Sequence, residues 1–125
     1  MAKKNKKVLI VEDERPLARA LELKLTNAGF LTLVANDGQA ALDILKKEKV
    51  DLILLDLVMP RVGGFEFLEK MKSSKNKAPV FVTSNLGQKE DLEKAKKFGI
   101  KNYFVKSDVN INEIIAEVKK FLKVK

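Results

Sequence analysis

Hydrophobic residues along this chain follow two alternating patterns. Short continuous apolar runs occur at residues 8–11 (VLIV), 31–35 (LTLVA), 52–55 (LILL), 80–83 (VFVT) and 103–105 (YFV). Such runs are typical of strands that are buried on both faces of a parallel sheet. The segments between them space their apolar residues at helical intervals, which indicates helices that each bury one face.

The last of these segments shows the helical pattern most clearly. Its apolar stripe, opposite Lys and Glu side chains, consists of Ile111, Ile114, Ile115, Val118, Phe121 and Leu122. Asn110, followed three residues later by Glu113, is a suitable N-terminal cap for this helix. Pro16 suits the first turn of the first helix. Gly29 and Gly99 suit the left-handed positions where the first and fourth helices should end.

Five strand–helix repeats with short connections predict an α/β fold, a doubly wound five-stranded parallel sheet with helices on both faces. The 125 residues fit one domain, which we expect to span 1–125, with a core of about residues 6–123 and no output domain. No apolar run approaches the roughly 18 residues of a membrane helix, and the basic N-terminus lacks the features of a signal peptide. We therefore expect a cytoplasmic protein without a membrane partner.

The composition excludes several kinds of site. The chain has no Cys and no His, which excludes disulfides, thiolate metal sites, His-dependent nucleophilic catalysis and a phosphohistidine carrier. A net charge of +8 is compatible with a nucleic-acid partner, but four lysines lie within the first seven residues and four within the last seven. Basic chain ends are usually solvated, so we expect no specific nucleic-acid binding.

Polar side chains follow the apolar runs at what should be one edge of the sheet, because ligands of open parallel sheets bind outside the carboxyl ends of the strands. These residues are Glu12, Asp13 and Glu14 after the first run, Asp56 after the third, Ser84 after the fourth and Lys106 after the fifth. Carboxylates this close repel each other unless a cation neutralises them, and oxygen ligands favour Mg²⁺ or a similar ion. An Asp placed there can attack phosphorus and hold the group as an acyl phosphate. The metal and Lys106 would offset charge on the phosphoryl oxygens, and the Ser84 hydroxyl would donate one more hydrogen bond.

Each of these residues also has a simpler interpretation. Glu12 and Asp13 are suitable acids for the start of the first helix, and Asp56 is an ordinary residue for a loop after a strand. Ser84 fits a turn, and Lys106 fits a surface amine whose stem packs on the sheet. The joint arrangement at four strand ends, rather than any one residue, favours a phosphoryl-transfer site.

Four motifs carry a resemblance to a known family: VLIVEDE, DLILLDLVMPRVGGFEFL, APVFVTSNLG and NYFVK. Together they extend over essentially the whole chain, which resembles the receiver domains of two-component response regulators, the family of the chemotaxis response regulator. The resemblance implies a flavodoxin-like (βα)5 fold with strand order 2-1-3-4-5. It also implies phosphorelay signalling by a phosphoacceptor that dephosphorylates itself slowly, rather than by a turnover enzyme.

The resemblance implies a role for individual residues. Asp56 would be the phosphoacceptor, Asp13 would bind Mg²⁺ (or Mn²⁺) directly, and Glu12 would assist directly or through water. The backbone carbonyl of Val58 would complete the protein ligands, and Lys106 matches the lysine of the family.

The same resemblance implies a conformational switch. Ser84 matches the switch hydroxyl and Tyr103 the switch aromatic, while Met59–Pro60 and Gly64 match the loop after the phosphoacceptor. Phosphorylation would draw Ser84 to the phosphoryl group and let Tyr103 rotate inward. This motion would reshape the face made by the fourth helix, the fifth strand and the fifth helix, where a downstream protein binds.

The chain departs from the family pattern at several positions. Ser107 follows the lysine where the family usually has a proline with a cis bond, so we expect a trans bond here. Asn85 stands where alanine or glycine is usual, and Gly63 where Asp or Asn is usual. Val58 and Leu86 flank the phosphoryl site by resemblance. Neither can orient an attacking water, which predicts slow self-dephosphorylation.

Partners and competing functions follow from these features. We expect a histidine kinase or histidine phosphotransfer protein as donor, and a monomer or a phosphorylation-dependent dimer. The face made by the fourth helix, the fifth strand and the fifth helix, which we call the output face, is rich in lysines that are solvated or attract an acidic partner: Lys89, Lys94, Lys96, Lys97 and Lys101.

A pseudo-receiver that binds partners without phosphorylation is the main alternative function. A flavodoxin-like cofactor binder is disfavoured because the acids of VEDER, which follow the first apolar run, would repel a phosphate group. A dehalogenase-like phosphatase is disfavoured because the sequence Asp56-Leu57-Val58 lacks the second acid that such enzymes carry.

Overall fold

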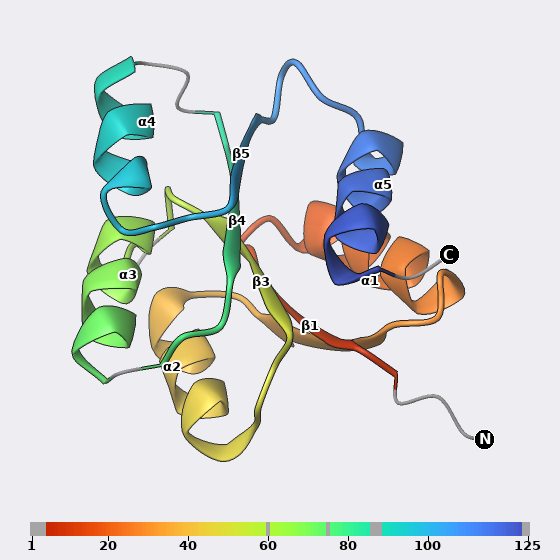
Figure 1. Ribbon diagram of the computed structural model, residues 1–125, viewed down its shortest axis with the longest axis horizontal. Helices are drawn as coiled ribbons and strands as arrows, with labels where there is room; N and C mark the ends of the chain where they lie inside the picture. Colours follow the sequence, from red (N-terminus) through yellow and green to blue (C-terminus); the bar gives the residue numbers. More distant parts are fainter. Residues whose placement is uncertain (1–4, 60, 75, 86–88, 124–125) are drawn as a thin grey trace.

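The computed structural model describes residues 5–59, 61–74, 76–85 and 89–123. Within them, five strands and five helices alternate along the chain (Figure 1). The strands are β1 (Lys7–Val11), β2 (Leu31–Ala35), β3 (Leu52–Asp56), β4 (Val80–Ser84) and β5 (Asn102–Val105). The helices are α1 (Arg15–Asn27), α2 (Gly38–Lys47), α3 (Gly64–Ser73), α4 (Lys89–Lys96) and α5 (Ile111–Leu122).

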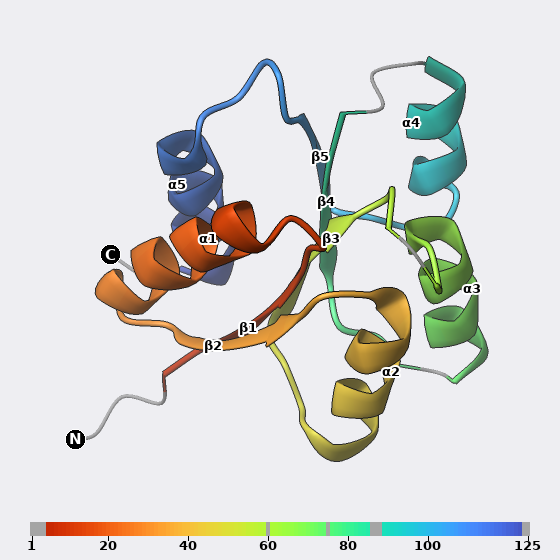
Figure 2. The ribbon, with the colours of Figure 1, turned by 180° about the vertical axis from the view of Figure 1, so that it is seen from behind.

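The strands form one parallel sheet in the order β2-β1-β3-β4-β5, which confirms the predicted fold and strand order. Figures 1 and 2 show α1 and α5 on one face of the sheet and α2, α3 and α4 on the other. Because every strand runs the same way, all carboxyl ends lie on one side of the sheet, which for β4 and β5 is toward the top of Figure 1. The residues that follow the strands are therefore brought to a common edge.

Two hydrophobic clusters, one on each face of the sheet, explain why the strands read as continuous apolar runs. Ile10 and Leu54 pack on the side of α1 and α5, whereas their neighbours Leu9 and Ile53 pack on the side of α2 and α3. All four side chains are at most 1% exposed. A central strand with both faces covered must be apolar at every position, which is the pattern that the sequence shows.

Most helix signals in the sequence correspond to the structure. Asn110 caps α5, because its side-chain oxygen accepts a 2.9 Å hydrogen bond from the backbone N–H of Glu113. Pro16 lies in the first turn of α1. Gly29 (φ 98°) and Gly99 (φ 79°) take the left-handed conformation that lets the chain leave α1 and α4. Among the helices of the described residues, none has the length and apolar character needed to span a membrane.

At their carboxyl ends, two strands extend one residue further than predicted, and both extra residues are polar. Asp56 pairs in register with Thr83, and Ser84 with Val105, so each is the last residue of its strand rather than the first residue of a loop. Their backbones are fixed by the sheet, which holds both side chains more rigidly than a loop would.

Candidate functional site

Three acidic side chains converge at the carboxyl ends of β1 and β3. Glu12 and Asp13 follow β1, Asp56 ends β3, and one carboxylate oxygen of each lies within 4.8 Å of the other two. Glu12 is 1% exposed and Asp56 is 3% exposed, while Asp13 is partly exposed at the rim. The neighbouring positions of β1 and β3 in the sheet bring these carboxylates together.

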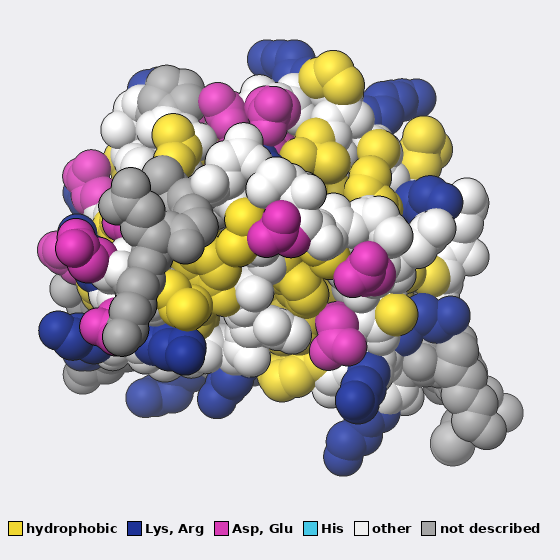
Figure 3. Space-filling model, turned by 90° about the horizontal axis from the view of Figure 1, so that it is seen from above, with side chains coloured by type: hydrophobic (Ala, Val, Ile, Leu, Met, Phe, Trp, Pro, Cys, Tyr) yellow, Lys and Arg dark blue, Asp and Glu magenta, His cyan; other side chains and the backbone are white. Residues whose placement is uncertain are grey.

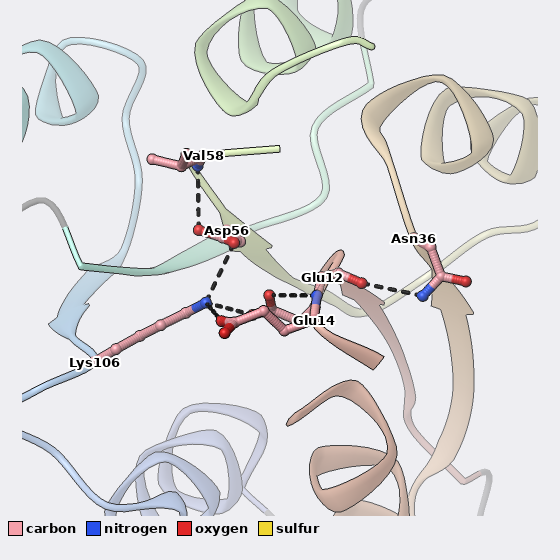
Figure 4. A network of polar contacts seen from close by, with 6 residues as sticks. All are labelled: Glu12, Glu14, Asn36, Asp56, Val58 and Lys106. Carbon is pink, nitrogen blue, oxygen red and sulfur yellow. Dashed lines mark hydrogen bonds and ion pairs between the residues drawn. The ribbon is translucent and has the colours of Figure 1, made fainter. Parts of the chain in front are cut away.

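One amine faces this cluster. The Nζ atom of Lys106 lies 2.9 Å from Oε1 of Glu12 and 3.2 Å from Oδ2 of Asp56. It also lies 2.9 Å from Oε2 of Glu14, and Figure 4 shows the lysine extending across the strand ends to reach all three. The lysine side chain is only 12% exposed, so its charge acts at short range and with little screening.

Glu14 is a site residue that the sequence placed at this end of the sheet but to which it gave no role. It is the N-cap residue of α1, but its side chain makes no capping hydrogen bond and instead contacts Lys106. The available signal was its place as the third acid of the VEDER run. Oε2 of Glu12 accepts a 3.2 Å hydrogen bond from the backbone N–H of Glu14, the residue before the first turn of α1.

Burial raises the pKa of both carboxyl groups that lie deep in the pocket, Glu12 and Asp56. Removal from water raises the pKa of Glu12 to about 7; the nearby amine of Lys106 opposes this rise, and the charge of Asp56 adds to it. Burial also raises the pKa of Asp56, against the charge of Lys106. For Lys106, burial lowers the pKa, but the contacts with Glu12 and Glu14 outweigh it and raise the pKa above its usual value. A protonated amine thus stands among carboxylates that burial disfavours in their charged form.

The chemistry of the donor set fits a hard divalent cation. Oε1 of Glu12 is buried and has no hydrogen-bond donor aligned with it among the described residues, although the Lys106 amine is 2.9 Å away. Carboxylate oxygens without nitrogen or sulfur ligands match Mg²⁺ or Mn²⁺. Viewed from above, acidic side chains lie both near the centre of this face of the molecule and along one side of it, and Lys and Arg side chains lie mainly around its margin (Figure 3).

The segment after β3 closes one side of the pocket. The backbone N–H of Val58 donates a 3.1 Å hydrogen bond to Oδ1 of Asp56, as Figure 4 shows. The Val58 residue is 56% exposed. Its backbone therefore contacts the Asp56 carboxylate, while its apolar side chain offers no hydrogen bond to a water molecule.

Ser84 and Tyr103 are adjacent in space. Ser84 is fully buried at the end of β4, and its carbonyl accepts a 2.8 Å hydrogen bond from the N–H of Lys106. Burial and the charge of Asp91 raise the pKa of the Tyr103 phenol, and a side-chain hydrogen bond with Ser84 acts in the opposite direction. This contact links the partly buried Tyr103 on β5 to the hydroxyl at the end of β4.

The departures from the family pattern leave the pocket intact. Asn85 is exposed after β4. No cis peptide bond occurs among the described residues, so the bond from Lys106 to Ser107 is trans, and the amine still reaches the carboxylates.

One lysine expected to be solvated makes a contact within the protein. The Nζ atom of Lys94 lies 4.3 Å from the centre of the Phe65 ring, over which its charge is favourably placed. Leu86, Pro60 and the side chain of Lys89 lie outside the described residues.

Comparisons with known proteins agree on one family. A family model described as the response regulator receiver domain matches residues 8–119. Sporulation initiation phosphotransferase F of Bacillus subtilis is 35% identical over 121 residues, which cover 97% of each chain. Several other relatives are longer response regulators, 32–33% identical, of which the chain spans about half, 48–52% of their length.

Solved structures agree with this result. The receiver domain of the Francisella response regulator 1452 superimposes with a TM-score of 0.88 at 30% identity, covering 95% of this chain and 98% of that one. The response regulator TrrA of Thermotoga maritima, solved in complex with Mg²⁺ and BeF, superimposes with a TM-score of 0.78 at 27% identity, covering 92% and 97%. The three clustered acids thus lie in a fold shared with response regulators.

Proposed function

This chain belongs to the response regulator receiver domain family, and from this premise we propose that its Asp56 accepts a phosphoryl group beside a divalent metal ion. The chain is a two-component signalling module, a phosphoacceptor rather than a turnover enzyme. One observation carries the assignment to Asp56. Its buried carboxylate ends β3 with an amine 3.2 Å away and two further acids within 4.8 Å.

Asp56 is the best nucleophile of the cluster. Its Oδ1 is held by the backbone N–H of Val58 and its Oδ2 by the Lys106 amine, so the carboxylate is fixed before any donor arrives. In the proposed reaction, an Asp56 oxygen forms a bond to phosphorus while the bond from phosphorus to the donor's imidazole nitrogen breaks. The electron pair stays on that nitrogen, which takes up a proton, and the product on Asp56 is an acyl phosphate.

Glu12, Asp13, Asp56 and the carbonyl of Val58 would hold the metal ion, Mg²⁺ or Mn²⁺. When bound, the ion would neutralise the clustered carboxylates and offset charge on the phosphoryl oxygens. The clustering of three carboxylate oxygens and the poorly satisfied Oε1 of Glu12 support this ligand set.

Lys106, Ser84 and Tyr103 would respond to the new charge. We assign Lys106 to the phosphoryl oxygens, because its protonated amine already lies beside the acceptor carboxylate. Ser84 would donate its hydroxyl to the phosphoryl group, which would release its contact with Tyr103 and alter the face of α4, β5 and α5. The contact between Ser84 and Tyr103 is what couples the pocket to that face.

A histidine kinase or a histidine phosphotransfer protein is the proposed donor, and a protein that reads the face of α4, β5 and α5 is the proposed target. The relationship to a Bacillus subtilis protein named as a sporulation phosphotransferase supports a place in a phosphorelay. Cytoplasmic location, the absence of an output domain and the oligomeric state stay predictions.

The test compares the native protein with Asp56→Asn after incubation with acetyl phosphate and Mg²⁺, read by intact mass. We expect one phosphoryl group on the native protein, none on Asp56→Asn, and none on either protein in excess chelator. Equal labelling of the variant would reject Asp56 as the acceptor. No labelling of the native protein would instead favour the pseudo-receiver.

A further inference from the structure

The edge of the sheet opposite Asp56 contains three adjoining hollows. They have volumes of about 430, 250 and 410 Å³, and Asn76 lines all three. The first lies between α2 and α3, the second beside α3, β4 and Gly99, and the third against residues 49–51. Because they share Asn76, and two of them also share Lys77 and Pro79, they form one extended concave surface.

This surface is basic, and we call it the basic floor. Its lysines are Lys46, Lys49, Lys70, Lys72, Lys77 and Lys101, the last of which lines the second hollow although the sequence placed it on the face of α4, β5 and α5. Asp51 is the one acid among the residues that line the three hollows, and its Oδ2 already accepts a 2.8 Å hydrogen bond from the N–H of Lys7. Lys70 pairs with the exposed Glu66 at 3.8 Å, and within the described part of the chain no ion pair involves the other five lysines.

Helix ends account for part of this charge. Lys46 lies in the last turn of α2, and Lys70 and Lys72 in the last turn of α3, where cations offset the partial negative charge of a helix C-terminus. Lys49, Lys77 and Lys101 lie in the segments between a helix and the next strand. Their positions outside the helices mean that the helix dipole does not explain these three lysines, of which Lys77 lines both the second and the third hollow.

Apolar side chains lie between the lysines. Leu42 and Leu45 line the first hollow, and Leu68 and Met71 line the second. No arginine lines the described hollows, and their one aromatic residue, Phe98, packs against the core. Nucleic-acid surfaces favour arginine forks and aromatic rings free to stack on bases, and the floor offers neither.

We propose that the basic floor docks an acidic amphipathic segment of a partner protein, with Asp and Glu facing the lysines and Leu or Phe side chains entering the hollows. The lysines would speed association and set the salt dependence, while the apolar contacts would hold the segment. Because the floor lies at the opposite edge of the sheet from Asp56, docking is independent of phosphorylation. The chain would thus have two binding surfaces: the basic floor, which binds with or without phosphorylation, and the face of α4, β5 and α5, which responds to it.

The test measures binding of a labelled synthetic peptide, with Glu and Asp on one helical face and Leu and Phe on the other, by fluorescence anisotropy with the full chain. The floor variant carries Lys49→Glu, Lys77→Glu and Lys101→Glu. The matched control carries Lys6→Glu, Lys24→Glu and Lys119→Glu, an equal change of charge at residues that line none of the hollows. Lys-to-Gln versions of both sets serve if a charge reversal impairs folding.

We expect the floor variant to bind the peptide about tenfold more weakly than the native protein and the control to bind within about twofold, with affinity falling as salt rises. Asp56→Asn should bind as the native protein does, so this result is independent of the phosphoacceptor assignment. Equal losses in both variants, or no binding to the native protein, would overturn the proposal. Tighter binding of a single-stranded RNA that also depends on the floor lysines would overturn the acidic segment as occupant.

Discussion

The surroundings of Lys106 set the chemistry proposed for the pocket. A single amine contacts Glu12, Glu14 and Asp56, so its charge is fixed, and the loop holds it without the proline that the family usually has after this lysine. Its backbone N–H also donates to the carbonyl of Ser84, which ties the lysine to the end of β4. Lys106 is protonated as an ordinary lysine is, and its contribution to the proposed chemistry is that its charge is held beside Asp56.

Lys106→Met should slow phosphorylation of the protein by acetyl phosphate about 100-fold, because removing one positioned donor of an oxyanion site typically costs this much. The rate is read from intact mass over time at saturating Mg²⁺. Lys96→Met, a change of the same kind at an exposed lysine of α4, should leave the rate within about twofold. Equal rates for Lys106→Met and the native protein would contradict the role given to Lys106.

An apolar Val58 predicts a long-lived acyl phosphate, because its side chain cannot orient an attacking water. The residue is 56% exposed, and its side chain offers no hydrogen bond. Val58→Asn should speed self-dephosphorylation about tenfold, because an amide at this place can orient an attacking water. The decay of phosphorylated protein after removal of acetyl phosphate measures this, with Val58→Leu as the apolar control. Decay that is unchanged or slower in Val58→Asn would reject the idea.

At the scale of elements, the loop after β3 is locked to the start of α2. The N–H of Gly38 donates a 3.1 Å hydrogen bond to the carbonyl of Val62, and Arg61 pairs with Asp37 at 3.0 Å. Arg61 takes a positive φ of 63°, which is unfavourable for a residue with a side chain. The neighbouring turn holds the loop in this form, and the loop begins directly after the proposed acceptor.

Gly38→Ala should lower the free energy of unfolding by about 1–3 kcal/mol, because a Cβ at this position would clash with the backbone oxygen of Val62. Gly63→Ala is the matched control. Its φ is −74°, and a Cβ there would meet nothing closer than 3.8 Å, so we expect little change. Urea denaturation compares the two variants. Equal stability of Gly38→Ala and the native protein would show that the two loops are not locked together.

These loops mark the limit of what the sequence could predict. Strands and caps follow from local patterns, such as the apolar run before Asp56 or the pairing of Asn110 with Glu113, and the structure has them within about a residue. The contact of Gly38 with Val62 joins segments 24 residues apart. It depends on how the finished layers pack, which local patterns do not encode. The contact of Glu14 with Lys106, 92 residues away, was missed for the same reason.

The whole molecule separates its charges along the strands, with acids at the carboxyl ends and the basic floor at the other edge. The acidic end makes the stability of the metal-free protein depend on pH. Folding raises the pKa of Glu12 from 4.5 to about 7, so the folded state binds this proton more tightly than the unfolded state does. Folding also raises the pKa of Asp56. The contribution of Lys106 is constant in this range, because its pKa is raised and stays above it.

In the presence of a chelator, the free energy of unfolding should therefore fall as pH rises from about 4.5 to 7, by up to about 3 kcal/mol from Glu12. Mg²⁺ should restore stability near neutral pH and have little effect near pH 4.5. Urea denaturation across this range measures both effects, and Glu12→Gln should flatten the profile. Stability that rises with pH in the chelator would contradict the reading of the pocket as a destabilising cluster of acids.

The position of the phosphoryl group within the chain decides whether Asp56 is the phosphoacceptor. Borohydride reduces an aspartyl phosphate to homoserine, so protein treated with acetyl phosphate and Mg²⁺, then reduced and digested, reports the acceptor by peptide mass spectrometry. We expect homoserine at position 56 and nowhere else, and none when a chelator is present. Homoserine at position 13, or at any other aspartate in place of position 56, would contradict the assignment of Asp56.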